Sequence, residues 1–164
     1  MKVILILLSL LLSGCTTNTV NGIKSQVSII DRVDPHSLKV NQGRFYAVRI
    51  ELINGTDTTL NFWTMSCSWQ DNWVIEDKAL SFFVNCPKNT PKMIQLKSNT
   101  KITYDGIIEL LDTINFSTSK NLRLGFVLIK KNEVHRDDEF KNILFQKIDA
   151  KKDIIWSEPF KVDK

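Results

Sequence analysis

The residues with the most distinctive chemistry in this sequence are its three cysteines, Cys15, Cys67 and Cys86. A thiol can act as a nucleophile, bind a metal ion, accept a lipid or form a disulfide, and its surroundings decide between these roles. Cys67 lies in the segment FWTMSCSWQDNW, residues 62–73, which also holds three of the four tryptophans. Two points therefore need to be decided: the role of each thiol, and whether the aromatic segment binds a ligand or forms part of the core.

Cys15 stands at the end of an N-terminal segment that has the features of a secretory signal. Lys2 precedes an apolar run over residues 3–12, which is shorter than the roughly 20 residues that a membrane-spanning helix needs. The residues LSGC at positions 12–15 resemble the lipobox of bacterial lipoproteins, in which the cysteine receives a diacylglycerol before the chain is cut in front of it. The resemblance implies a signal peptide over residues 1–14 and a membrane anchor on Cys15.

The residues around Cys15 also suggest where the protein resides. Thr16 is not the aspartate that is associated with inner-membrane retention in enteric bacteria, so attachment to the outer membrane, facing the periplasm, is favoured if the source is Gram-negative. Residues 15–22 are polar and are expected to form a flexible tether. Export and a formal net charge of only +4 argue against a nucleic-acid partner. The alternative is an ordinary signal peptide with a cysteine near its cleavage site.

Cys67 and Cys86 form an even pair in a chain expected to leave the cytoplasm, where disulfides persist. We therefore predict that they are joined, and closing a loop of about 19 residues is worth roughly 3 kcal/mol. The alternatives are two free thiols or two ligands of a metal ion. A zinc site would need two more ligands, and neither His36 nor His135 stands at a suitable spacing, so we expect no metal and no cofactor.

The aromatic segment admits a structural and a functional interpretation. In the first, which we favour, the large rings fill the core and cover the disulfide. In the second, a recognition surface for a sugar or a protein is formed by Trp63, Trp69, Gln70, Asp71, Asn72 and Trp73. We expect at least one tryptophan to be substantially exposed, because Phe62 and Trp63 point to opposite faces of a strand and the loop after Cys67 is polar.

No motif in the sequence indicates catalysis. The nucleophile motif G-x-S-x-G and the zinc-protease motif H-E-x-x-H are both missing from the printed sequence, and no catalytic residue is predicted. Asp137, Asp138 and Glu139 lack the spacing of a calcium loop and are expected at a solvated turn.

Period-two alternation of apolar and polar residues predicts strands along most of the chain. Residues 46–53 and 60–64 are expected to form a hairpin around Asn54-Gly55, and Asp105-Gly106 predicts a bulge. Residues 139–146 could form one helical turn, whereas a long helix is not expected there. The other predicted strands cover residues 27–31, 37–40, 80–85, 93–97, 100–110, 122–130, 142–148 and 154–162.

This pattern predicts an all-β fold, an immunoglobulin-like antiparallel β-sandwich of about eight or nine strands in a single domain over residues 23–164. The prediction concerns architecture only, because the widely spaced cysteines and intervening tryptophan of true immunoglobulin domains are missing from the sequence.

Three functions remain open at this point. The first is a membrane-anchored, non-enzymatic lipoprotein that binds a protein or glycan of the cell envelope. The second is an inhibitor or immunity-type lipoprotein that blocks a periplasmic enzyme or toxin. The third is a hydrolase whose site the sequence does not reveal.

Overall fold

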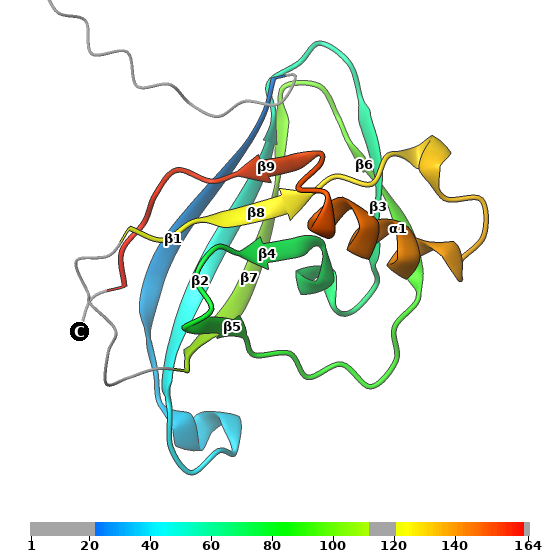
Figure 1. Ribbon diagram of the computed structural model, residues 1–164. Helices are drawn as coiled ribbons and strands as arrows, with labels where there is room; N and C mark the ends of the chain where they lie inside the picture. Colours follow the sequence, from blue (N-terminus) through cyan, green and yellow to red (C-terminus); the bar gives the residue numbers. More distant parts are fainter. Residues whose placement is uncertain (1–21, 112–120, 163–164) are drawn as a thin grey trace, which may run out of the picture.

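The computed structural model describes residues 22–111 and 121–162, and in them nine strands build the predicted antiparallel β-sandwich. The larger sheet has the strand order β1-β2-β7-β5, and its three long strands run the length of the domain (Figure 1). Its strands are β1 (Ile23–Val33), β2 (Arg44–Asn54), β7 (Thr100–Leu110) and β5 (Leu80–Phe82).

The second layer contains two smaller sheets, which pair β3 with β6 and place β8 between β4 and β9. An isolated bridge between Phe62 and Lys130 joins β3 to the residues after β8, so the two small sheets are continuous there. In Figure 1, β4, β8 and β9 cross in front of the long strands. The strands of this layer are β3 (Leu60–Met65), β6 (Pro91–Leu96), β4 (Trp73–Ile75), β8 (Leu124–Val127) and β9 (Ile154–Trp156).

The core between the layers follows from alternation along the strands. On β2, Tyr46, Val48, Ile50 and Leu52 are all buried and face the second layer, whereas Arg49 between them is exposed. All four residues of β8 are buried, as expected for a central strand with both faces covered.

The segment 142–148, which we predicted as a strand, is instead part of the helix α1 (Glu139–Asp149). Phe140, Leu144 and Lys147 are its buried residues, at the spacing of one helical face. Phe140 and Leu144 belong to a second hydrophobic cluster with Val127 and Ile129, on the far side of the second layer from the main core. The domain therefore has a third, helical layer over β8 (Figure 1).

The predicted hairpin of residues 46–53 with 60–64 is also wrong. β2 pairs with β1 and β7, whereas β3 crosses to the other layer and pairs with β6. The buried side chain of Asn54 makes this crossing possible, because its amide donates to the carbonyl oxygens of Thr58, Leu96 and Lys97 at 2.8, 3.1 and 3.2 Å. The turn predicted after residue 53 is thus present, but the chain passes from one sheet to the other there and does not form a hairpin.

Two smaller predictions are corrected as well. The register of β2 with β7 runs unbroken through Gly106, and the bulge lies in β1 between Ile29 and Asp31. Residues 37–40 are not a strand, since Ser37 and Leu38 belong to the 3₁₀ turn η1 (Pro35–Leu38), which Asp34 caps by accepting from the backbone amide of His36.

Candidate functional site

The aromatic segment spans three elements: β3, the 3₁₀ turn η2 (Trp69–Asn72) and β4. The predicted disulfide is present, with the sulfur atoms of Cys67 and Cys86 2.05 Å apart and their Cα atoms 5.8 Å apart. It ties the turn after β3 to the chain between β5 and β6.

Trp63 and Phe62 point to opposite faces of β3, as the alternation predicted, but neither face is open. Phe62 is fully buried in the main core, where its ring lies 5.2 Å from that of Phe126. Trp63 is half-buried and packs against the second cluster, and its indole nitrogen donates to the carbonyl of Lys131 at 3.2 Å. The layer formed by α1 and the 3₁₀ turn η3 (Lys131–Glu133) thus covers the face that we expected to be solvated.

Trp69 points inward onto β7. Its ring stacks on Tyr104 with centroids 4.7 Å apart and meets Phe82 edge-on at 5.9 Å. Gly106 leaves the space that the indole occupies, because a Cβ atom there would lie 3.0 Å from two of its ring carbons. Burial raises the pKa of the Tyr104 hydroxyl to about 12.

We expect Gly106→Ala to lower the free energy of unfolding by about 1–3 kcal/mol, because the added methyl group overpacks the contact with Trp69. Chemical denaturation of the purified protein would measure the loss. In a double-mutant cycle with Trp69→Leu, the smaller side chain should absorb most of the cost of Gly106→Ala. Equal costs in both backgrounds would show that Gly106 is not there to make room for the indole.

Trp73 is the most buried of the three tryptophans, with 5% of its surface exposed. Its ring lies 5.1 Å from Phe126 and 6.5 Å from Tyr104. The indole nitrogen is buried and has no hydrogen-bond partner among the described residues.

The polar residues of η2 also serve the fold. Asn72 is fully buried, and its amide donates to the carbonyls of Trp63 and Val127 at 3.0 and 3.2 Å, which joins β3 to β8. Asp71 accepts a hydrogen bond of 2.6 Å from Ser68, and Gln70 is half-buried. Trp63 and Trp69 are half-buried and Trp73 is buried, so the expectation that one of these tryptophans is substantially exposed is wrong.

Sequence reasoning overlooked Asn89, whose side chain forms hydrogen bonds with the residues beside the disulfide. Its side-chain oxygen accepts from the backbone amides of Cys67 and Ser68 at 3.1 and 3.3 Å, and its amide contacts the hydroxyl of Ser68. A lone asparagine after a Pro-Lys pair carries no sequence signal for such a long-range contact.

The residues considered for metal binding or catalysis do not converge. His36 lies in η1, and His135 is exposed just before α1. Glu139 accepts from the backbone amides of His135 and Arg136, and these hydrogen bonds lower the pKa of its carboxyl. No group of three or more potential metal ligands occurs within residues 22–111 and 121–162.

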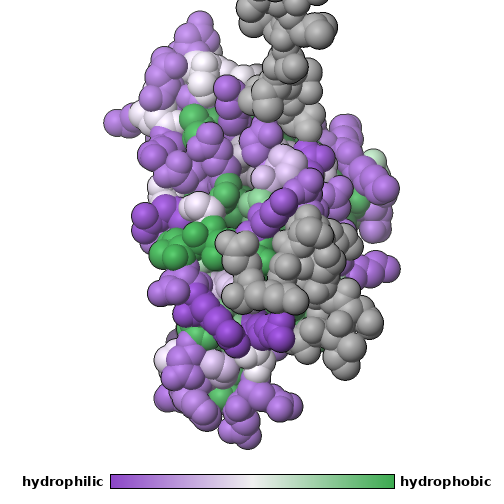
Figure 2. Space-filling view, turned by 90° about the vertical axis from the view of Figure 1, so that its left-hand side faces the viewer, coloured by the Kyte–Doolittle hydropathy of each residue, from purple (hydrophilic) through white to green (hydrophobic). Residues whose placement is uncertain are grey.

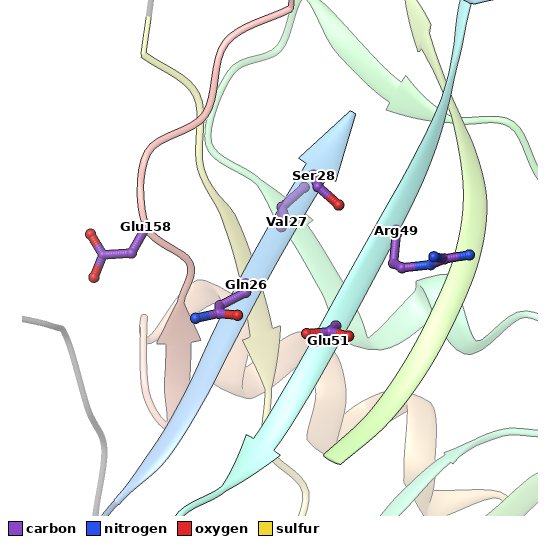
Figure 3. A pocket seen from close by; sticks show the side chains of 6 residues that line it. All are labelled: Gln26, Val27, Ser28, Arg49, Glu51 and Glu158. Atoms are coloured by element: carbon purple, nitrogen blue, oxygen red, sulfur yellow. The ribbon is translucent and has the colours of Figure 1, made fainter. Parts of the chain in front are cut away.

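An open hollow lies on the outer face of the larger sheet, beside the edge strand β1, with a volume of about 360 Å³. Figure 3 shows Gln26 and Ser28 on β1, Arg49 and Glu51 on β2, and Glu158 on the segment after β9. In Figure 3, Glu51 and Glu158 lie on either side of Gln26, and the carboxylate of Glu158 points away from Glu51.

Two charged residues of this hollow, Arg49 and Glu51, form ion pairs with residues of the neighbouring strand β7. Arg49 donates to Asp105 on β7 at 2.8 and 3.3 Å, and this hydrogen bond raises the pKa of Arg49 and lowers that of Asp105. Lys101 likewise donates to Glu51 at 2.6 Å. Figure 2 shows this side of the molecule as mostly hydrophilic, with small apolar areas between the polar side chains. The hollow can therefore offer hydrogen bonds and both signs of charge to a polar ligand.

No protein-family model and no curated protein matches this chain. Among solved structures, the chain is similar to the crystal structure of a FixG-related protein from Vibrio parahaemolyticus, with a TM-score of 0.42 and 10% sequence identity. The similarity covers 88% of this chain and 100% of that one.

Proposed function

We propose that this chain is a lipid-anchored, non-enzymatic lipoprotein of the bacterial cell envelope that binds a protein or glycan partner. The observation that carries the proposal is the pairing of Cys67 with Cys86, which suits an oxidising compartment and leaves Cys15, at the end of the LSGC motif, as the remaining cysteine. Residues 1–21, including this motif, lie outside the described part of the chain. No helix in that part is long and apolar enough to cross a membrane.

The outer face of the larger sheet is the surface that we assign to the partner. The aromatic segment packs inward, whereas the hollow of Figure 3 presents the exposed side chains of Gln26, Ser28, Arg49 and Glu158. These groups suit a polar partner, because amide, hydroxyl, guanidinium and carboxylate groups can each exchange water for a partner's hydrogen bonds.

Cys15→Ser is expected to abolish incorporation of a palmitate analogue and to release the protein from membranes, because acyl chains on that thiol supply the anchor. Metabolic labelling followed by membrane fractionation would measure both effects. The matched control is the double variant Cys67→Ser/Cys86→Ser, which also removes cysteines, here those of the disulfide, but should still incorporate the label. A Cys15→Ser protein that labels and sediments like the unaltered one would overturn the proposal.

A further inference from the structure

One end of the sandwich brings together the start of the domain and two turns; we call it the tether-side end, and it comprises Gly22 and the turns at residues 54–59 and 97–99. Gly55 donates its backbone amide to the carbonyl of Gly22 at 3.0 Å, and Asn99 donates to Thr56 at 3.2 Å. The three carbonyls held by Asn54 connect the same turns. Hydrogen bonds therefore hold the parts of this end together. Gly22, through which the chain connects back to Cys15, belongs to it.

Lysines are gathered at the tether-side end. Lys24 on β1, Ile53 on β2 and Lys101 on β7 are direct neighbours across the outer face of the larger sheet. Lys24 and Lys101 are exposed, and Ile53 between them is half-buried. Lys97 adds a third exposed amino group in the turn that Asn54 holds, and Asp57 is the acidic residue of the neighbouring turn.

The charge of the outer face changes sign along the strands. The first cross-strand row holds Lys24 and Lys101, and the next row holds Glu51, which pairs with Lys101, so these two rows together carry one net positive charge. The row of Ser28, Arg49 and Asp105 is neutral, since its two charges are paired. The row farthest from the tether, which contains Val33, Phe45 and Glu109, carries one negative charge. The positive pole of this face thus coincides with the end from which the tether leaves.

We propose that the tether-side end docks against the anionic surface of the membrane that holds the lipid anchor, with Lys24 and Lys97 facing lipid phosphates and Lys101, which pairs with Glu51, beside them. This inference rests on the proposed anchor at Cys15. Gly22 lies seven positions after Cys15, and even fully extended this stretch of chain reaches only about 25 Å. The lysines are therefore kept close to a surface whose attraction extends over about one Debye length, roughly 8 Å at physiological salt.

Docking in this way also determines how the rest of the domain is oriented relative to the membrane. The long strands point away from the bilayer, so η1 and the far end of β7 lie distal, and the hollow of Figure 3 remains open at the side of the domain. A partner could then reach the hollow while the protein stays docked.

The experiment uses the full lipidated protein in vesicles of phosphatidylcholine, with or without phosphatidylglycerol. Single thiols for a fluorophore are introduced by Thr59→Cys at the tether-side end or by Asn41→Cys at the distal end; both positions are exposed. Energy transfer to a headgroup acceptor reports the distance of each end from the membrane. We expect stronger transfer from position 59 when the vesicles are anionic, a loss of this gain at high salt, and little change at position 41.

The charge-reversal variant Lys24→Glu/Lys97→Glu should abolish the gain in transfer, because each lysine near an anionic surface favours the docked domain by about fivefold, and two by roughly 25-fold. Its control is Lys39→Glu/Lys78→Glu, which makes the same charge change at exposed distal positions and should leave the gain intact. Equal transfer in neutral and anionic vesicles, or equal effects of the two variants, would overturn the docking. A preparation that carries no lipid on Cys15 would instead overturn the proposed function on which the docking rests.

Discussion

Trp73→Ala is expected to lower the free energy of unfolding by about 3–5 kcal/mol, the usual cost of truncating a large buried ring. The tryptophan is 5% exposed and lies between Phe126 of β8 and Tyr104 of β7, so it bridges the two layers of the sandwich. Its removal would leave a cavity between the two layers that the closely packed neighbouring side chains close only in part. Denaturation in urea, followed by the fluorescence of the remaining tryptophans, would measure the loss.

The matched control is Trp73→Phe. It keeps an aromatic ring against Phe126 and removes an indole N–H that is buried without a partner among the described residues, so the loss should be clearly smaller. A Trp73→Ala protein with an unchanged midpoint would mean that the ring lies at a surface, and the functional interpretation of the aromatic segment would then have to be reinstated. A loss of the expected size leaves the segment as part of the core.

Strand positions were predictable wherever one face of a strand meets the core and the other meets water. Residues 100–110 were predicted as a strand and form β7 with those bounds, and residues 46–53 lie within β2. Both strands belong to the larger sheet, whose outer face is solvated, so their sequences alternate. Strand pairing was not predictable in the same way, because the turn after Asn54 is compatible with a hairpin or with a change of sheet, and only long-range contacts to residues 96 and 97 decide between them.

The exposure of the aromatic segment was mispredicted for a related reason. Alternation correctly separated Phe62 from Trp63, but it does not reveal what lies on each side of a strand. A two-layer sandwich would have left Trp63 in solvent, whereas the third layer partly buries it. Similarly, Gly106 signalled an irregularity in the chain, and the close approach of Trp69 that explains it comes from residues distant in sequence.

The third layer was missed because its helix carries a lysine where an apolar residue was expected. Phe140, Leu144 and Lys147 share the buried face of α1, and the charged residue interrupts the apolar repeat. The amino group of Lys147 donates to the carbonyl of Leu128 at 2.7 Å and to the carboxylates of Glu133 and Asp153 at 2.7 and 2.8 Å. Its three donors are thus satisfied by three separate segments, a compensation that only the fold reveals.

Lys147→Met is therefore expected to destabilise the protein by about 3 kcal/mol at neutral pH, although methionine suits an apolar helix face better. The substitution leaves two carboxylates and the Leu128 carbonyl without the cation that compensates their burial. Chemical denaturation would measure the loss. The control Lys141→Met makes the same change at an exposed position of the same helix and should alter stability little, within about 0.5 kcal/mol. Equal effects at the two positions would show that the contacts of Lys147 contribute nothing.

The pH dependence of this loss separates charge from packing. Burial alone would raise the pKa of Asp153, but the hydrogen bond and charge of Lys147, helped by Lys130 and Lys152, outweigh it and lower the pKa. A carboxyl whose pKa is lower in the folded protein stabilises it above the unfolded pKa of about 3.9, and this contribution disappears as the pH falls through the folded pKa. The difference between unaltered protein and Lys147→Met should therefore stay constant above about pH 5 and shrink below pH 4, whereas a cost due only to altered packing would persist in acid.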